Sequence, residues 1–145
     1  MKQGNVIALC SRVAEATHKE IIQELKKRGV EGIVPSHGGI MMLLFDGEEY
    51  TMQELARKIH RTKPTVTVLV EKLEAFGYVE RRKSDEDGRI TLLRLTEKGQ
   101  ALQAVFREIS EVVNHRVYAG LSEEEAAEVE RLLSKVKLNF CPTNG

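Results

Sequence analysis

The sequence predicts a mainly helical α+β fold in which three or four helices precede a two-stranded hairpin and two helices follow it. Apolar residues recur at helical spacing over most of the chain. Capping residues stand just before several of these runs, and an Asp-Gly pair joins two short β-rich segments. The 145 residues suffice for one domain with a core and are too few for two. We therefore expect a single domain over residues 1–145.

The first helix is expected over residues 5–28. Its apolar side chains have helical spacing, and it ends in Lys26-Lys27-Arg28-Gly29, a basic last turn followed by a glycine stop. A second apolar segment occupies residues 40–45. Gly38 and Gly39 stand in its first turn, where glycine weakens a helix, so its start is not defined by the sequence.

Two short helices follow, each with a threonine placed to cap its first turn. Thr51-Met52-Gln53-Glu54 has the spacing of a capping box, and this helix is expected to run to about Ile59. Thr62 can cap the next helix, whose first turn tolerates Pro64 because that amide needs no helical partner. This helix after Thr62 is expected to end at Gly77.

A hairpin and two further helices complete the predicted order. Residues 78–83 and 90–95 are short β-rich runs, and the connection between them contains the Asp-Gly pair, a hairpin signal. Thr96 begins a long helix that closes near Gly120, and Ser122 to Glu125 form a second capping box before the last helix.

A short helix, a tight turn, a second helix and an immediate hairpin describe a winged helix-turn-helix, here over residues 51–96. At about 100° per residue, the second helix turns an apolar stripe inward, made of Val66, Leu69, Val70, Leu73 and Phe76. Its outward face is mostly small, hydroxylic or basic, although it also carries Glu71. Such a face fits a major groove, since small side chains allow close approach while Thr and Lys reach phosphates or base edges.

The formal net charge is zero, which at first argues against a nucleic-acid partner. The charge is unevenly distributed, however: residues 57–83 hold eight basic and three acidic groups, a net charge of +5. Basic residues at the end of the first strand and Arg89 beyond the turn fit a wing that lies along a minor groove. Asp87 is expected to fix Arg89 or to cap the turn. The alternative for this basic cluster is a solvated hairpin.

The residues predicted to contact DNA lie on the second helix and the hairpin: Thr62, Lys63, Pro64, Thr65, Thr67, Val68, Lys72, Arg82, Lys83, Asp87 and Arg89. Val68 is unusual among them, because an outward valine has no core to join. It could pack on a thymine methyl group or against another part of the protein.

These segments closely resemble the MarR (multiple-antibiotic-resistance regulator) family. The resemblance is carried by Glu54-Leu55-Ala56, by residues 65–74 and 77–81, and most clearly by Asp87-Gly88-Arg89 followed by Leu95-Thr96 and Gly99, which is similar to the family's Asp-x-Arg wing signature. It covers nearly the whole chain. Two departures are that Val68 stands where relatives often have arginine and that Glu86 replaces a common proline.

The resemblance implies a homodimeric DNA-binding transcriptional regulator, expected to repress from a pseudo-palindromic operator. Residues 35–96 would form the winged DNA-binding region, and residues 1–28 and 97–140 a helical dimerisation region. The dimerisation residues implied are Val6, Leu9, Val13, Val129, Leu132, Leu133 and Val136. Without the family resemblance, these stripes could also be intramolecular core.

The resemblance also raises two hypotheses about a signal. Many relatives bind small anionic or phenolic compounds, and His37 and Met41 would border such a pocket here, although methionines at helical spacing more often belong to a core. Some relatives sense oxidants through an N-terminal cysteine, and Cys10 and Cys141 are the candidates here. The favoured alternative is a small buried hydrophobe and a tail thiol.

Other classes of protein are disfavoured. The sequence has no Gly-rich phosphate loop, no nucleophile motif and no Cys/His metal spacing, so neither an enzyme nor a cofactor or metal is expected. No run approaches the roughly 18 apolar residues of a membrane span, and no signal peptide or disulfide framework is evident, so a cytoplasmic location is expected. The remaining rival is a winged helix that binds protein without specific DNA binding, which Val68 and Pro64 favour and the lysines and arginines oppose.

Overall fold

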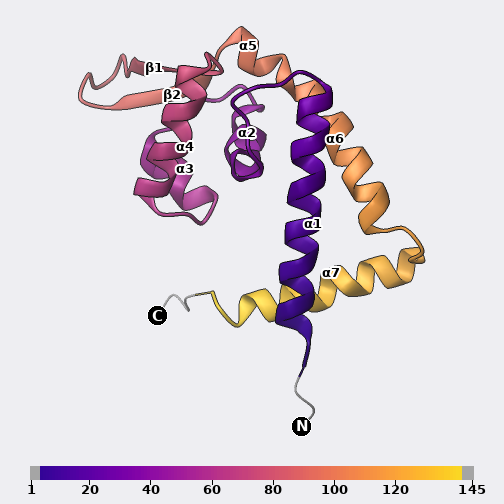
Figure 1. The fold of residues 1–145 in the computed structure, drawn as a ribbon. Coiled ribbons are helices and arrows are strands. Elements are labelled where there is room, and N and C mark those ends of the chain that lie inside the picture. Colours follow the sequence, from indigo (N-terminus) through magenta and orange to yellow (C-terminus); the bar gives the residue numbers. More distant parts are fainter. Residues whose placement is uncertain (1–3, 142–145) are drawn as a thin grey trace. The chain divides into compact units, whose positions relative to one another are not determined.

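The computed structural model describes residues 4–141 and contains a helical fold with one hairpin (Figure 1). The elements in chain order are α1 (Val6–Lys27), the 3-10 turn η1 (Pro35–His37), α2 (Gly38–Leu44), α3 (Met52–Lys58), α4 (Lys63–Ala75), β1 (Val79–Lys83), β2 (Thr91–Leu95), α5 (Glu97–Gln100), α6 (Leu102–Val117) and α7 (Glu123–Leu138). The predicted mainly helical α+β class is confirmed. The chain forms two compact units that divide between Ser110 and Glu111, within α6 rather than at a linker.

The core of the first unit is formed by α2, α3, α4 and β2. Its side chains are wholly or almost wholly buried, namely Ile40, Leu44, Leu55, Val66, Val70, Leu73 and Leu93. Burying a side chain of this kind stabilises the fold by about 1.5–3 kcal/mol. Because three of the seven come from the inward stripe of α4, that helix is held by one face and presents the other outward.

The predicted helix starts are confirmed by their hydrogen bonds. The side-chain oxygens of Thr51, Thr62 and Thr96 each accept from the amide three residues later, at 3.1, 3.4 and 3.1 Å. Ser122 and Glu125 form the full reciprocal capping box, with distances of 3.0 and 3.1 Å. Each such cap contributes about 1 kcal/mol, so these local sequence signals define where the helices begin.

Phe76 differs from its predicted position on the inward stripe. The side chain is 36% exposed, and its ring stacks on Tyr78 with 6.5 Å between centroids. The ring also covers Gly32, whose φ is +83° and where a Cβ atom would lie 2.3 Å from the ring. The last turn of α4 is therefore fixed against the loop after α1 rather than in the central core.

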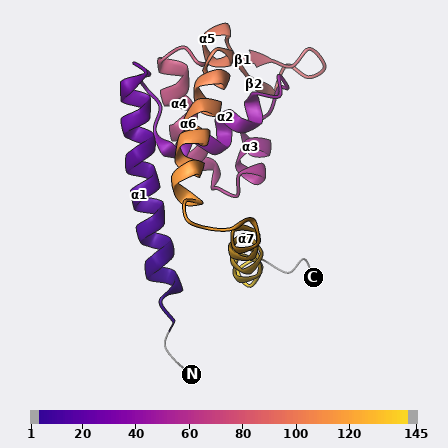
Figure 2. The same cartoon turned by 90° about the vertical axis from the view of Figure 1, so that its right-hand side faces the viewer.

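The hairpin is antiparallel, with register from Val79 opposite Leu95 to Lys83 opposite Thr91. Tyr50 extends the sheet at the free edge of β2, since its amide and carbonyl pair with those of Leu93 at 3.0 and 2.7 Å. Figure 1 shows the hairpin tip projecting beyond α3 and α4, and Figure 2 shows the same from a direction turned by 90°.

The hairpin connection runs from residue 84 to residue 90, and Gly88 lacks the positive φ that a two-residue Asp-Gly turn requires. The Ser84 amide donates to the Ile90 carbonyl at 2.9 Å, and the Ser84 hydroxyl accepts from the amides of Glu86 and Asp87. The long helix predicted from Thr96 is divided into α5 and α6 at Ala101. None of the helices in the described part of the chain is long and apolar enough to span a membrane.

Candidate nucleic-acid interface

The turn between α3 and α4 sets the geometry of the site. His60 has a φ of +56°, the one positive value at a non-glycine residue among the described positions. This left-handed conformation is uncommon for such residues. It lets the Arg61 amide return to the Ala56 carbonyl at 3.0 Å and places Thr62 to cap α4. The helix-turn-helix predicted from sequence is therefore present with a tight turn.

Three threonines line the start of α4, and two of their hydroxyl groups are committed within the helix. Thr62 donates to the Thr65 hydroxyl at 2.9 Å, and Thr67 donates to the Lys63 carbonyl at 2.8 Å. The Thr65 hydroxyl accepts in this arrangement, which leaves its own proton free. Thr65 is therefore the hydroxyl best prepared to donate to a phosphate oxygen.

The outward face of α4 is exposed as its periodicity predicts. Val68 is 66% exposed, and Lys63, Pro64 and Lys72 are also exposed. Neither lysine forms an ion pair within residues 4–141. The outward face of α4 thus carries an exposed apolar side chain, and both lysines of the helix are available cations.

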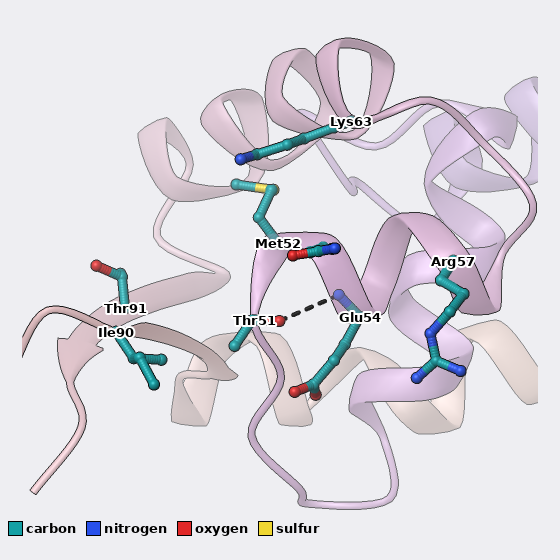
Figure 3. A pocket seen from close by; sticks show the side chains of 8 residues that line it. Thr51, Met52, Glu54, Arg57, Lys63, Ile90 and Thr91 are labelled. Atoms are coloured by element: carbon teal, nitrogen blue, oxygen red, sulfur yellow. Dashed lines mark hydrogen bonds between the residues drawn. The ribbon is translucent and has the colours of Figure 1, made fainter. Parts of the chain in front are cut away.

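An open groove of about 590 Å³ lies between the start of α3, the start of α4 and the hairpin. It is lined by Thr51, Met52, Gln53, Glu54, Arg57, Lys63, Ile90 and Thr91. Figure 3 shows Lys63 extending over Met52, with Ile90 and Thr91 facing them from the hairpin. The cations of Arg57 and Lys63 make this groove suitable for an anionic backbone.

Arg57 and Arg61 are functional candidates that the motif analysis missed. Both side chains are exposed, and neither side chain has a hydrogen-bond or ion-pair partner in the described structure. The signal that could have found them was the basic window from residue 57 to residue 83, which begins with Arg57.

The basic residues of β1 are engaged within the protein. Arg81 donates to Glu74 at 2.7 Å, Arg82 to Glu49 at 2.8 Å, and Lys83 to the Thr91 hydroxyl at 3.1 Å. Arg82 and Lys83, both predicted to contact DNA, are therefore held by partners in the protein without DNA.

Arg89 at the hairpin tip is 92% exposed. Asp87 accepts from both the amide and the guanidinium of Arg89, at 3.0 and 3.2 Å. These hydrogen bonds, the amide first, hold the pKa of the Asp87 carboxyl below its usual value. The expectation that Asp87 fixes Arg89 or caps the turn is confirmed, since it does both.

His37 and Met41, the residues predicted to border a ligand pocket, have no exposed surface. The His37 Nδ1 atom accepts from the Val34 amide at 2.9 Å, and Nε2 lies 3.1 Å from the Leu69 carbonyl of α4. Burial, and after it the charge of Lys72, lowers the pKa of His37. Because neither side chain is exposed, their role in a ligand pocket stays a prediction.

Both cysteines are free and exposed. The favoured alternative of a buried Cys10 is therefore wrong for the single chain. Within residues 4–141, no three His, Cys, Asp or Glu side chains come together to hold a metal ion.

The predicted dimerisation residues are all exposed in the single chain. Their exposed fractions are 47, 52 and 53% on α1 (Val6, Leu9, Val13) and 44, 46, 42 and 43% on α7 (Val129, Leu132, Leu133, Val136). No residue of α7 is buried. Their role in dimerisation stays a prediction.

Comparison with known proteins places this geometry in a family. The family model for the MarR family matches residues 35–91. The HTH-type transcriptional regulator YdgJ of Bacillus subtilis (strain 168) is 29% identical over 144 residues, covering 96% of this chain and 88% of that protein. SarZ of Staphylococcus epidermidis, also named an HTH-type transcriptional regulator, is 31% identical over 105 residues, covering 72% of this chain and 70% of SarZ.

A similar fold is seen in the crystal structure of an S. aureus MepR–DNA complex. The TM-score is 0.82 at 24% identity, and the match covers 95% of this chain and 100% of that one. The fold and the site thus define a winged helix-turn-helix protein of the transcriptional-regulator class. Within that class, the chain belongs to the MarR family. The relatives compared are named as regulators and not as enzymes.

Proposed function

We propose that the protein is a homodimeric, sequence-specific DNA-binding repressor in which α4 enters the major groove of a pseudo-palindromic operator. The observation that carries this proposal is that α4 exposes Val68 on its outward face and has two lysines without ion-pair partners within residues 4–141, beside a groove that contains Arg57. A helix with one buried face and one small, cationic face is what a major groove accommodates.

The side chains divide by chemistry into two roles. Lys63, Thr65 and Arg57 would bind phosphate oxygens and fix the position of α4, since these contacts carry little sequence information. Thr67, Val68 and Lys72 lie along the helix where base edges would be read. Arg89, held by Asp87 at the hairpin tip, would lie along the adjacent minor groove, where the potential is most negative.

The dimer is supported by the exposed apolar stripes of α1 and α7. Seven apolar side chains on these two helices are 42–53% exposed. Exposed apolar surface of this extent is typical of a protein–protein contact. A two-fold dimer would cover them and place two copies of α4 at half-sites one helical turn apart. The similar fold of the MepR–DNA complex supports the DNA-binding part of this proposal. Because its relatives are named as bacterial transcriptional regulators, we also propose that the protein acts in the cytoplasm.

Selection of bound sequences from random duplex DNA tests the proposal. We expect enrichment of a pseudo-palindrome, bound with an affinity that falls steeply as salt increases. The rival function, a winged helix that binds another protein, is favoured by the exposed Val68 and Pro64. Failure to enrich any sequence, together with salt-insensitive binding, would support that rival and reject the repressor.

We also propose that a signal releases the DNA, either a small molecule near His37 and Met41 or an oxidant acting at Cys10 and Cys141. The exposed thiols support the second route, in which peroxide oxidises two thiols to a disulfide and is itself reduced to water. Non-reducing electrophoresis after peroxide treatment should show a mobility change that Cys10→Ser abolishes. If Cys10→Ser leaves the pattern unchanged, the oxidant route through Cys10 is rejected.

A further inference from the structure

Glu49 binds arginines from both strands of the hairpin. Its two carboxylate oxygens lie 2.8 Å from Nε and 2.6 Å from Nη2 of Arg82, a bidentate pair. One of these oxygens also lies 3.5 Å from Nη1 of Arg94. Glu49 is only 24% exposed, although it stands in the connection before α3. A bidentate arginine pair fixes orientation as well as distance.

The sheet register explains how one carboxylate reaches both strands. Tyr50 pairs with Leu93 of β2, and its side chain is buried, so Glu49 projects on the opposite face of the sheet. Arg94 of β2 and Arg82 of β1 belong to that same face, because each is one residue away from the pair Leu93 and Arg81, of which Leu93 points to the core. Glu49 therefore crosses from the edge segment over β2 to β1.

The other groups on this face complete the arrangement. Arg94 is also bound by Glu80 at 2.8 Å, and Arg82 approaches Asp85 at 3.6 Å and the Lys83 carbonyl at 3.1 Å. The Arg82 hydrogen bond is the largest cause that lowers the pKa of Glu49, so the carboxylate stays ionised at neutral pH. The charges of Arg82 and Arg94, which a simple count of basic residues would make available to DNA, are thus neutralised within the protein.

We propose that Glu49 is a positioning and specificity-determining residue for DNA binding. By holding Arg82 and Arg94, it fixes the hairpin to the segment that leads into α3, and it withholds both arginines from non-specific contact with phosphate. This inference rests on the proposed function. The inference predicts that loss of Glu49 strengthens binding to unrelated DNA and weakens discrimination between the operator and unrelated DNA. Loss of a merely structural contact would not strengthen binding to unrelated DNA.

The test compares Glu49→Gln with Glu48→Gln, a matched control that removes the same charge from the adjacent, exposed residue, which has no arginine partner in residues 4–141. Dissociation constants of the full chain for the selected operator and for a scrambled duplex are measured over a range of salt concentrations. Circular dichroism verifies folding. With Glu49→Gln, the scrambled duplex should bind more tightly, with a salt slope steeper by about 0.9 for each arginine that gains a phosphate.

The ratio of operator affinity to scrambled-duplex affinity should fall several-fold for Glu49→Gln and stay near the wild-type value for Glu48→Gln. Adding Arg82→Gln to Glu49→Gln should return the scrambled-duplex slope toward wild type and reduce the ratio no further, because both residues act through one contact. If Glu49→Gln does not fold, Arg82→Lys carries the test: it keeps the charge, cannot form the bidentate pair, and should also lower the ratio.

A Glu49→Gln variant with the same affinity ratio and salt slope as Glu48→Gln would overturn the inference. So would a folded Glu49→Gln protein that binds both duplexes more weakly in equal proportion, or a folded Arg82→Lys protein with an unchanged ratio. A wild-type protein that selects no sequence at all would instead overturn the proposed function, and this inference with it.

Discussion

Replacement of Arg89 by alanine tests whether the hairpin tip contacts DNA. The Arg89 side chain is 92% exposed, and its partner in the protein is Asp87, at 3.2 Å. An ion pair so open to solvent adds little to the stability of the fold. The variant should therefore fold like the wild type, and any change in DNA binding should come from the lost cation.

The size of the effect follows from counting phosphates. Each phosphate contact contributes about 0.9 to the slope of log affinity against log salt, and a dimer has two hairpins, so the slope should become less steep by up to about 1.8. Over a fourfold range of salt, a slope change of about 1.8 alters the ratio of wild-type to variant affinity about twelvefold. The variant should be most impaired at low salt, and equally for operator and scrambled duplex.

Fluorescence anisotropy with labelled operator and scrambled duplexes measures both slopes. Arg107→Ala is the control, because Arg107 is an exposed arginine of α6 outside the winged region. Combining Arg89→Ala with Asp87→Asn separates the lost attraction from repulsion by the Asp87 carboxylate, since asparagine keeps an acceptor for the Arg89 amide. An unchanged slope would refute the minor-groove assignment of the wing, and weakening confined to the operator would show that Arg89 reads bases instead.

Three further predictions concern the helix, the dimer and a buried histidine. Val68→Ala should change the preferred base at one position in each half-site, and identical selected sites for both proteins would reject a thymine-methyl contact. Leu133→Glu should convert the dimer to monomer in sedimentation equilibrium, because it places a charge in the apolar stripe of α7; a variant that stays dimeric would place the interface elsewhere. His37 has a pKa lowered by burial from its ordinary 6.5, so below about pH 6.5 the unfolded chain binds a proton that the folded chain does not, and stability should fall on acidification until the lowered pKa is passed. Urea unfolding at about pH 7.5 and about pH 5.5 should therefore show a larger loss for wild type than for His37→Asn, and equal losses would contradict this explanation.

The parts of the fold that the sequence predicts well are those determined by neighbouring residues. Thr51, Thr62 and Ser122 are caps because a hydroxyl and an amide three residues apart meet in the first helical turn. The inward position of Val66 and Val70 follows from the helical period alone. These interactions involve little more than one turn of chain, so no tertiary information is needed.

The parts that the sequence did not predict depend on contacts between distant segments. Arg82 was assigned to DNA from its place in a basic run, but its partner Glu49 is 33 residues away and reaches it only because Tyr50 joins the sheet. Phe76 has the correct helical phase for the core, yet the loop at Gly32 receives its ring. In both cases the tertiary arrangement decides between positions that the local pattern cannot distinguish.

The distribution of paired and unpaired cations also explains how a chain of zero net charge can bind DNA. In the hairpin, Arg81, Arg82 and Arg89 each have an acidic partner. By contrast, Arg57, Arg61 and Lys63, around the turn between α3 and α4, have no ion pair within residues 4–141. Because only a cation that replaces a condensed counterion contributes to the salt slope, the turn should contribute more to affinity than the larger basic run in the hairpin. The acidic side chains near the hairpin then restrict where a phosphate can bind. Contact between the hairpin and DNA therefore depends on the correct placement of α4.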